Sequence, residues 1–316
     1  MNINKKIIAI IAIVVIILLC VRFTNQEHLT IKYSDDKQTI IGERESGKLV
    51  DNMLRYKIFL NNEGFYVYIT PEPKTKKEQK TLVILPGYTY YDYKDANKKY
   101  APHKDFSNII NCLSDNYKII VIEYYGYNES DDSERSRSAD SICNEIHSVL
   151  TLFGIKKYTL MAHSVSGLYA MKYINEYKSE VEGFIGVDIT LPYYFLEGYK
   201  SNDSFLGYDF DPEKRETSKA YKNMYSYFWD TAKGLEGFKF PQTLPVILFA
   251  STSMKGYVDE RIEKGLLKTQ MKNYLEDMVT DTHKQQIQIL NGPRRLYTER
   301  HVTMANIIKE NLGKNK

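Results

Sequence analysis

The sequence predicts an α/β protein in which a mostly parallel β-sheet is flanked by helices on both faces. From residue 81 onward, short and continuously apolar segments alternate with segments of helical periodicity, which is typical of a parallel sheet covered on both sides. A hairpin pattern precedes this alternation. Near the middle of the chain, within Tyr158–Gly167, a strand passes into a helix through a turn of small residues.

The elements follow from this periodicity in chain order. A hairpin is expected over 56–69, because alternating apolar residues flank the turn Asn61–Gly64. Apolar runs predict strands at 81–85, 118–123, 158–161, 183–188, 245–250 and 286–290. Helical spacing predicts helices at 106–113, 133–152, from 168 onward, at 258–278 and at 302–312.

The first part of the chain has the pattern of a membrane anchor. Lys5 and Lys6 precede an apolar run from Ile7 to Val21, and residues 7–23 approach the thickness of a membrane. No small-x-small cleavage site follows this run. We expect a single-pass protein of the bacterial cell membrane whose N-terminus is cytoplasmic and whose catalytic domain is extracytoplasmic. A cleaved signal and a secreted protein are the alternative.

The rest of the chain suits one large domain with an insertion. The expected organisation is an anchor or signal at 1–26, a stalk or weakly structured lead-in at 27–55, a core formed by 56–190 and 244–316, and a cap or lid at 191–243. The stalk segment is polar and lacks sustained periodicity. The cap segment is rich in Tyr and Phe, holds the only tryptophan, Trp229, and interrupts the alternation between two sheet strands.

Composition and cysteine usage restrict the chemistry. The formal net charge is +3, which gives no reason to expect a nucleic-acid partner. Of the three cysteines, Cys20 lies in the apolar run, so Cys112 and Cys143 allow one disulfide at most. No HExxH, paired CxxC or calcium-loop spacing is present in the sequence. We therefore expect neither a metal nor a cofactor.

The turn in the middle of the chain is the strongest chemical signal. Ser164 stands at the tip of Ala162-His-Ser-Val-Ser-Gly167, and small residues lie two positions before and after it. Such a turn holds a serine in a strained backbone with its hydroxyl projecting above the sheet. The segment resembles the nucleophile elbow of the α/β-hydrolase superfamily, whose commoner form is Gly-His-Ser-x-Gly-Gly. Ala162 and Ser166 occupy its two glycine positions.

Two further segments carry the resemblance. Pro86-Gly87-Tyr88 follows the first buried strand, where the family has a loop that supplies an oxyanion donor. The resemblance implies the amides of Tyr88 and Val165 as the two donors, and Gly87 allows a close backbone approach. The segment Glu123–Ser130 looks like the family's Asp-x-x-Gly-x-Gly-x-Ser turn, whose role is structural.

A base and an acid are expected at the carboxyl ends of the strands, where open parallel sheets bind ligands. Of the six histidines only His301, after the last strand, stands at that edge, and the family's catalytic histidine occupies this place. The family's usual acid position lacks a carboxylate here, because that loop reads Ser251-Thr-Ser-Met-Lys255. Asp188, at the end of an earlier strand, is the favoured acid; Asp259 and then Glu260 are the alternatives.

The resemblance implies a serine hydrolase that cleaves a small-molecule ester, or a peptide-like amide, through an acyl-enzyme. The order Ser164, Asp188, His301 is the family's order of nucleophile, acid and base. A serine peptidase of the same fold shares all of these features. A catalytically silent surface binding protein is a second class, favoured by the missing acid and opposed by the retention of both Ser164 and His301.

Overall fold

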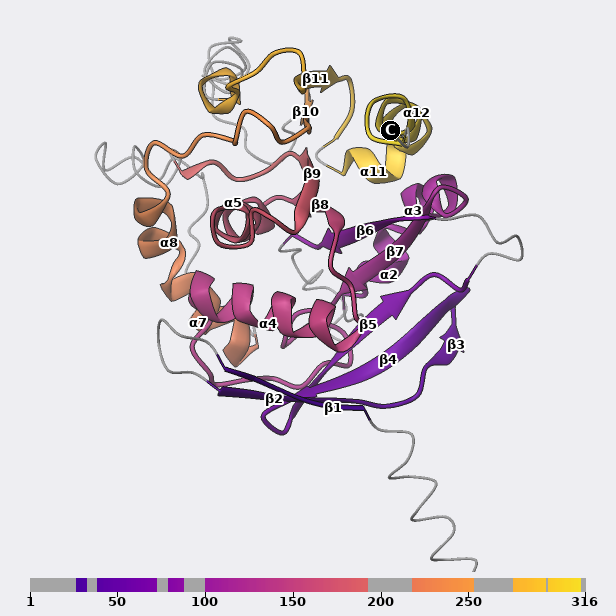
Figure 1. Ribbon diagram of the computed structural model, residues 1–316, viewed down its shortest axis with the longest axis vertical. Coiled ribbons are helices and arrows are strands. Elements are labelled where there is room, and N and C mark those ends of the chain that lie inside the picture. The colour runs from indigo at the N-terminus through magenta and orange to yellow at the C-terminus, as the bar shows by residue number, and fades with distance from the viewer. Residues whose placement is uncertain are drawn as a thin grey trace, which may run out of the picture.

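A computed structural model of the chain describes residues 27–32, 39–72, 79–87, 100–192, 218–252, 275–293 and 295–313 (Figure 1). Its strands are β1 (Glu27–Lys32), β2 (Thr39–Arg44), β3 (Lys48–Val50), β4 (Met53–Leu60), β5 (Glu63–Ile69), β6 (Lys80–Leu85), β7 (Tyr117–Ile122), β8 (Tyr158–His163), β9 (Val181–Val187), β10 (Val246–Ser251) and β11 (Gln285–Leu290). Its helices are α2 (Pro102–Asp105), α3 (Ser107–Leu113), α4 (Ala139–Leu152), α5 (Ser166–Glu176), α7 (Lys219–Ser226), α8 (Phe228–Gly234), α11 (Leu296–Glu299) and α12 (His301–Asn311).

The strands form one 11-stranded sheet, which confirms the predicted α/β class. The order is β1-β2-β4-β5-β7-β6-β8-β9-β10-β11, with β3 beside β4. The six strands from β7 to β11 in this order pair in parallel. The predicted hairpin is β4 and β5, and β5 joins the parallel part by pairing antiparallel with β7. Asn61 and Asn62 form its turn with φ of 51° and 75°, which asparagine tolerates.

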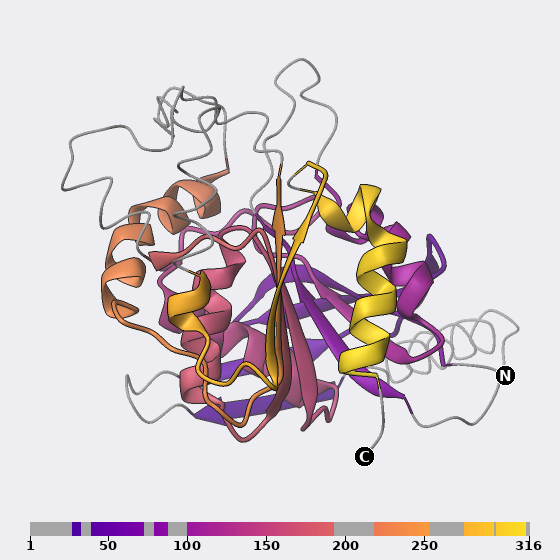
Figure 2. The ribbon, with the colours of Figure 1, turned by 90° about the horizontal axis from the view of Figure 1, so that it is seen from above.

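Helices cover both faces of the sheet, and this explains the unbroken apolar runs. Figures 1 and 2 show α3, α11 and α12 on one face and α4, α5, α7 and α8 on the other. Successive residues of β6 alternate between the two cores: Leu82 and Ile84 belong to one cluster, Val83 and Leu85 to the other. Because strand side chains alternate in direction, a strand buried on both faces must be apolar throughout.

The prediction of a polar stalk at 27–55 is wrong. β1 and β2 pair with each other antiparallel, β2 pairs with β4, and β3 folds back on β4. These strands have three to six residues, too few for a sustained alternation to stand out in the sequence. Their placement depends on distant partners instead: a methyl group at Gly42 would lie 2.9 Å from Leu152 of α4.

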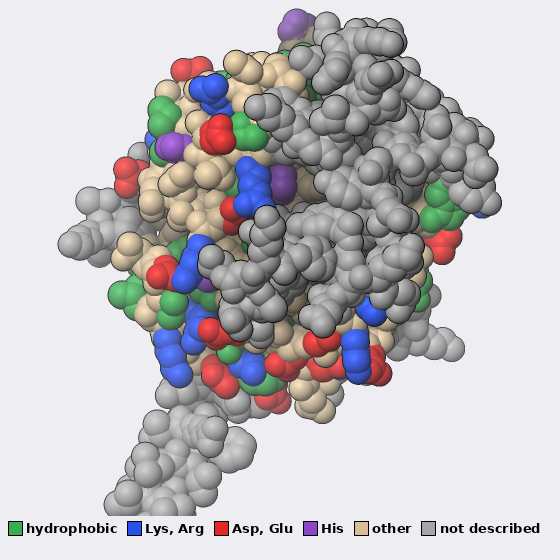
Figure 3. All heavy atoms as spheres, turned by 180° about the vertical axis from the view of Figure 1, so that it is seen from behind, with side chains coloured by type: hydrophobic (Ala, Val, Ile, Leu, Met, Phe, Trp, Pro, Cys, Tyr) green, Lys and Arg blue, Asp and Glu red, His purple; other side chains and the backbone are tan. Residues whose placement is uncertain are grey.

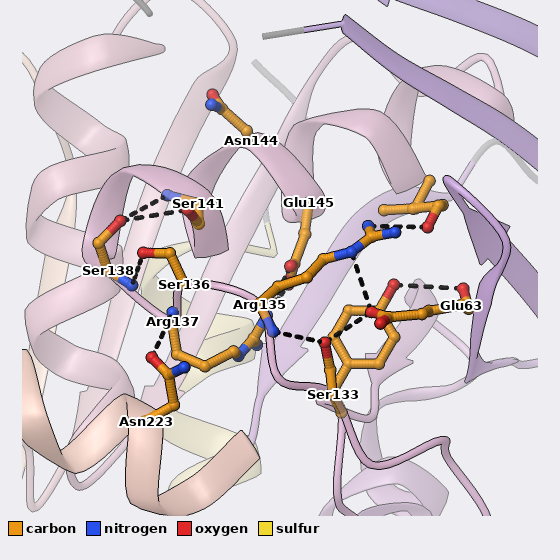
Figure 4. Close-up of polar contacts among 12 residues, drawn as sticks. Glu63, Ser133, Arg135, Ser136, Arg137, Ser138, Ser141, Asn144, Glu145 and Asn223 are labelled. Atoms are coloured by element: carbon orange, nitrogen blue, oxygen red, sulfur yellow. Dashed lines mark hydrogen bonds and ion pairs between the residues drawn. The ribbon is translucent and has the colours of Figure 1, made fainter. Parts of the chain in front are cut away.

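The loop between β7 and α4 explains why α4 begins later than the sequence predicts. Residues 133–138 form polar contacts with other elements rather than a first helical turn (Figure 4). The Arg135 guanidinium donates to the carbonyls of Leu60 (2.9 Å) and Asn61 (2.6 Å) in the hairpin. Arg137, 1% exposed, binds the Glu145 carboxylate at 2.5 and 2.6 Å. The helix starts at Ala139, and its N-cap residue Ser138 accepts the Ser141 amide at Oγ.

The same loop holds the described part of the predicted cap. Residues 193–217 lie outside the described residues, and the rest of the segment forms α7 and α8. The Asp132 carboxylate accepts the amides of Lys219 (2.9 Å) and Ala220 (2.8 Å), so it caps the first turn of α7. The amide of Arg137 donates to the Asn223 side chain of α7 at 3.1 Å. Through these contacts the loop after β7 anchors the insertion to the core.

Glu123, directly after β7, has the structural role that the sequence indicates. His103 lies in α2 and is stacked on Tyr68, with a distance of 3.7 Å between the ring centroids. One ring nitrogen contacts Glu123 (3.0 Å) and the other contacts Asp51 (3.2 Å). Burial raises the pKa of the Glu123 carboxyl, and the bond to His103 opposes this shift. With both ring nitrogens of His103 engaged, the cluster joins α2 to the residues that follow β3 and β7.

The predicted membrane segment, residues 7–23, lies outside the described residues. Within the described ranges, no helix combines the length and the apolar character that crossing a membrane requires. On the face shown in Figure 3, basic and acidic side chains are interspersed across the described surface. This mixture agrees with the small formal net charge of +3.

Candidate active site

Ser164 lies at the carboxyl end of β8, in a turn that leads directly into α5. Its φ of 53° is in the left-handed region, which costs a non-glycine residue about 1–2 kcal/mol. Three backbone hydrogen bonds hold this conformation: the Ser164 amide donates to Val187, and its carbonyl accepts the amides of Gly167 and Thr190. The side chain is half-buried and therefore reachable. The predicted elbow geometry is present.

Two glycines allow the neighbouring elements to come close to the elbow. A methyl group at Gly87 would lie 2.4 Å from His163 Nδ1 and 2.7 Å from Ser164 Cβ. A methyl group at Gly167 would lie 2.5 Å from Ile189, directly after β9. Both distances are too short for a real side chain. The backbone at Gly87 therefore approaches the elbow itself.

Of the two predicted oxyanion donors, the structure describes only Val165. Tyr88 lies outside the described residues. Val165 is the N-cap residue of α5, a helix of 11 residues. Its amide makes no hydrogen bond to another described residue. An amide at the N-terminus of a helix carries partial positive charge, which favours a developing oxyanion.

Asp188 ends the strand next to the elbow strand. It is 4% exposed, and its φ of 42° is again in the left-handed region. Its Oδ1 accepts the Ser251 amide of β10 at 2.8 Å. Because the Ser164 amide binds the carbonyl of Val187, Asp188 and the elbow lie at neighbouring strand ends. The alternative acids, Asp259 and Glu260, lie outside the described residues.

His301 is the first residue of α12 and is half-buried. Its Nδ1 lies 2.7 Å from the carbonyl of Thr298, so Nδ1 carries the hydrogen and Nε2 has the free lone pair in the neutral ring. Asn108 of α3 donates to the same carbonyl at 3.2 Å. Among the described residues, no hydrogen bond joins His301 to Asp188 or to Ser164. The structure brings Ser164 and Asp188 to one edge of the sheet. The described hydrogen bond of His301 is with Thr298 of α11, whose carbonyl also binds Asn108 of α3.

The segment before His301 is tied to the elbow strand by Tyr297. This ring stacks on Phe106 at 3.9 Å and meets the ring of His163 edge-on at 5.0 Å. Its hydroxyl donates to Asp105 (2.7 Å), which also accepts from Arg295 (3.2 Å). Burial raises the pKa of the Tyr297 phenol, which therefore remains a proton donor. These contacts fix α11 between α3 and the end of β8.

Comparison with known proteins gives the family. Residues 80–293 match the model of the family described as alpha/beta hydrolase fold, which is more than half of the chain. The chain belongs to the α/β-hydrolase family. The matched range contains Ser164 and Asp188 and ends before His301.

Individual proteins and solved structures are also similar to this chain. The uncharacterized protein YbdG of Bacillus subtilis (strain 168) is 32% identical over 165 residues, which are 47% of this chain and 51% of YbdG. The match therefore spans about half of that relative. The crystal structure of Smu.1393c from Streptococcus mutans has a TM-score of 0.56 at 15% identity, covering 84% of this chain and 99% of that one. Epoxide hydrolase VrEH1 from Vigna radiata has a TM-score of 0.55 at 12% identity, covering 82% and 98%.

Sequence reasoning missed the polar partners behind the elbow of this α/β-hydrolase. Ser166 was interpreted only as a small residue at a glycine position. In the structure its hydroxyl is fully buried and bonded to the carbonyl of Pro86 and to Tyr124. The available signal is the serine at the second glycine position of the motif, since a hydroxyl buried there needs a hydrogen-bond partner.

The strain at Ser164 has a measurable consequence for stability. We expect Ser164→Gly to be more stable than Ser164→Ala by about 1 kcal/mol, because glycine adopts a positive φ without the steric cost that alanine retains. Urea unfolding of both variants followed by circular dichroism measures the difference. Alanine is the matched control, since both changes remove the hydroxyl. Equal stabilities would contradict a strained elbow.

Proposed function

We propose that this chain is a serine acyl hydrolase whose nucleophile is Ser164 and whose substrate is a carboxylic ester or a related amide. The observation that carries the proposal is the elbow: a half-buried serine at φ 53°, between the close backbone of Gly87 and the start of α5. A strained backbone conformation persists only where the surrounding structure holds it in place, and such positions cluster at active sites.

The identity of the nucleophile favours acyl transfer over the chemistry named for some structural neighbours. Several of these neighbours are epoxide hydrolases at 10–16% identity, a likeness that concerns the fold. A serine hydroxyl that opened an epoxide would leave an ether, which water does not readily cleave. A serine hydroxyl that attacks an acyl carbon leaves an ester, which water can hydrolyse. Turnover at Ser164 therefore fits an acyl substrate.

The proposed reaction has two steps. Ser164 Oγ forms a bond to the acyl carbon while its proton passes to His301 Nε2, and that proton then leaves with the alkoxide or amine. Water next attacks the acyl-serine, and Ser164 Oγ recovers a proton as the acid is released. The Val165 amide and the amide of residue 88 would hold the oxyanion in both steps. Asp188, at the adjacent strand end, is the acid assigned to the charged imidazole.

A second candidate function is non-catalytic binding by a retained fold. Two observations favour it: His301 Nδ1 is bonded to a backbone carbonyl rather than to a carboxylate, and neither Ser251, the last residue of β10, nor Thr252 after it offers a carboxylate. A peptidase of the same fold would share the proposed mechanism and differ only in its leaving group. Substrate panels separate these possibilities.

The direct experiment is a panel of p-nitrophenyl esters and aminoacyl amides of increasing acyl length, together with a fluorophosphonate probe that labels activated serines. Ester hydrolysis and covalent labelling at Ser164 support the acyl hydrolase. Preference for the amides identifies a peptidase. Folded protein that neither turns over nor reacts with the probe leaves the binding protein as the function.

We also propose that the protein is anchored in the cell membrane with its catalytic domain outside the cytoplasm. The support is the apolar segment 7–23 with Lys5 and Lys6 on its short side. The full chain is expected in the membrane fraction after an alkaline wash, and external protease should digest it in spheroplasts. Deletion of residues 1–26 should abolish membrane retention. Full-length protein in the soluble fraction would contradict the anchor, and a shortened protein in the medium would identify a cleaved signal.

A further inference from the structure

Ser166 stands at a position where the elbow resemblance has glycine, and its hydroxyl does what a glycine cannot do. Ser166 is the first residue of α5 and is fully buried. Its Oγ lies 2.5 Å from the carbonyl oxygen of Pro86, in the segment that follows β6. The same Oγ lies 3.0 Å from the hydroxyl of Tyr124, in the loop after β7. One side chain thus joins the elbow helix to two other strand ends.

The hydrogens in this contact have one consistent arrangement. A carbonyl only accepts, so the single hydrogen of Ser166 Oγ goes to Pro86. The Tyr124 hydroxyl must then donate to Ser166 Oγ. Burial raises the pKa of the Tyr124 phenol, so this donor keeps its proton. The result is a directed relay from Tyr124 through Ser166 to Pro86, in which each bond polarises the next.

A second tyrosine of the same loop holds the next carbonyl. The Tyr127 hydroxyl donates to the carbonyl of Gly87 at 3.4 Å, a longer and weaker bond than the one from Ser166. The rings of Tyr124 and Tyr127 meet edge-on at 5.6 Å, so the two donors form one unit. The Gly87 carbonyl belongs to the same peptide group as the amide assigned to the oxyanion site. Because a peptide group is planar, a held carbonyl also orients that amide.

The segment that these groups hold is the one closest to the nucleophile. A methyl group built on Gly87 would lie 2.7 Å from Ser164 Cβ, so only a residue without a side chain fits this close to the nucleophile. The relay from Ser166 keeps the segment from moving outward, since Pro86 is bonded to the first residue of the helix that follows the elbow. The contact thus sets the separation between Ser164 and the Pro86–Gly87 backbone.

We propose that Ser166 is a positioning residue for acyl transfer, which together with Tyr124 and Tyr127 holds the Pro86–Gly87 backbone at the distance from Ser164 that the oxyanion requires. This inference rests on the proposed acyl hydrolase function and assigns that site a device absent from the common glycine form of the elbow. Without the Ser166 hydroxyl, the Pro86 carbonyl loses its donor and the buried Tyr124 hydroxyl loses its acceptor.

The test compares Ser166→Ala and Tyr127→Phe with the wild type in the full chain, on a p-nitrophenyl ester and on the matching thionoester. We expect kcat on the ester to fall about tenfold for Ser166→Ala, with KM changed less than about twofold, because oxyanion alignment acts in the transition state. Sulfur is a weak hydrogen-bond acceptor, so kcat on the thionoester should fall less. In Ser166→Ala the ratio of kcat on the ester to kcat on the thionoester should therefore decrease. A merely structural role would not change this ratio.

The chain offers matched controls for both variants. Ser148 is a fully buried serine whose hydroxyl donates to the carbonyl of Asn144 at 2.7 Å within α4. Tyr125 lies in the same loop as Tyr127, and its hydroxyl donates to the carbonyl of Glu63 at 3.2 Å. Ser148→Ala and Tyr125→Phe each delete one buried hydroxyl remote from the Pro86–Gly87 backbone. Both are expected to keep the ester-to-thionoester ratio of the wild type.

The possible outcomes are distinct. If the wild type reacts with a fluorophosphonate and Ser166→Ala keeps both kcat and the rate ratio, the positioning role is refuted while the hydrolase function stands. If the wild type neither reacts nor turns over, the function and this inference fall together. Should Ser166→Ala fold poorly, Tyr124→Phe removes only the outer donor of the relay and must lower the same ratio. The double variant Ser166→Ala/Tyr124→Phe should lower kcat on the ester no more than the stronger single variant does, because both residues act through one relay.

Discussion

Replacement of Ser164 by alanine is expected to abolish ester hydrolysis and fluorophosphonate labelling. The hydroxyl is the only group that the proposed mechanism uses to form the covalent intermediate, so its loss should lower kcat by at least about 10³-fold. The backbone turn should persist, because the bonds that hold it involve the amide and the carbonyl of residue 164. Stopped assays with a long-chain and a short-chain p-nitrophenyl ester measure the loss.

The control for Ser164→Ala is Ser148→Ala, which removes a buried serine hydroxyl within α4. This variant should keep wild-type activity and labelling. Near-normal hydrolysis by Ser164→Ala would show that another group carries the reaction, and the elbow would then be a purely architectural turn. Intact mass spectrometry of the labelled wild type, followed by peptide mapping, must place the adduct on the peptide that contains Ser164.

Replacement of His301 is expected to have the second largest effect. If Nε2 takes the Ser164 proton, His301→Ala should lower kcat by about 10³-fold or more, since removal of the base disables the nucleophile. The Thr298 carbonyl holds Nδ1–H, and this bond leaves Nε2 as the acceptor in the neutral ring. The measurement is the pH profile of ester hydrolysis for the wild type and for the variant between about pH 5 and 9.

His283→Ala is the matched control for this variant, because His283 is exposed and lies before β11, at the opposite end of that strand from α11. It should leave the profile unchanged. A His301→Ala variant that retains the wild-type rate and pH profile would exclude His301 as the base. Combined with normal labelling of Ser164, that result would require a base other than His301.

The fold was predictable to a large extent because its signals are local. Apolar runs such as Leu82–Leu85 record burial on both faces, and the Asn61–Gly64 turn marks the hairpin. The elbow at Ser164 was predictable for the same reason, since the small residues that permit a strained turn are its immediate neighbours. The short strands β1 to β3 escaped prediction because they have too few residues for a sustained alternation, and they are held in the sheet by pairing with each other and with β4.

The alternation of strands and helices, the strained serine, and Asp188 at the end of an apolar strand can all be read from the amino-acid sequence. Each of these depends on a few adjacent residues and on the backbone geometry they allow. Three contacts become visible in the folded chain alone: the Ser166 hydroxyl binds Pro86, Asp188 accepts the Ser251 amide, and His301 binds Thr298. Such contacts depend on which strand ends meet at one edge. Strand order and loop packing set that meeting, and neighbouring residues do not record it.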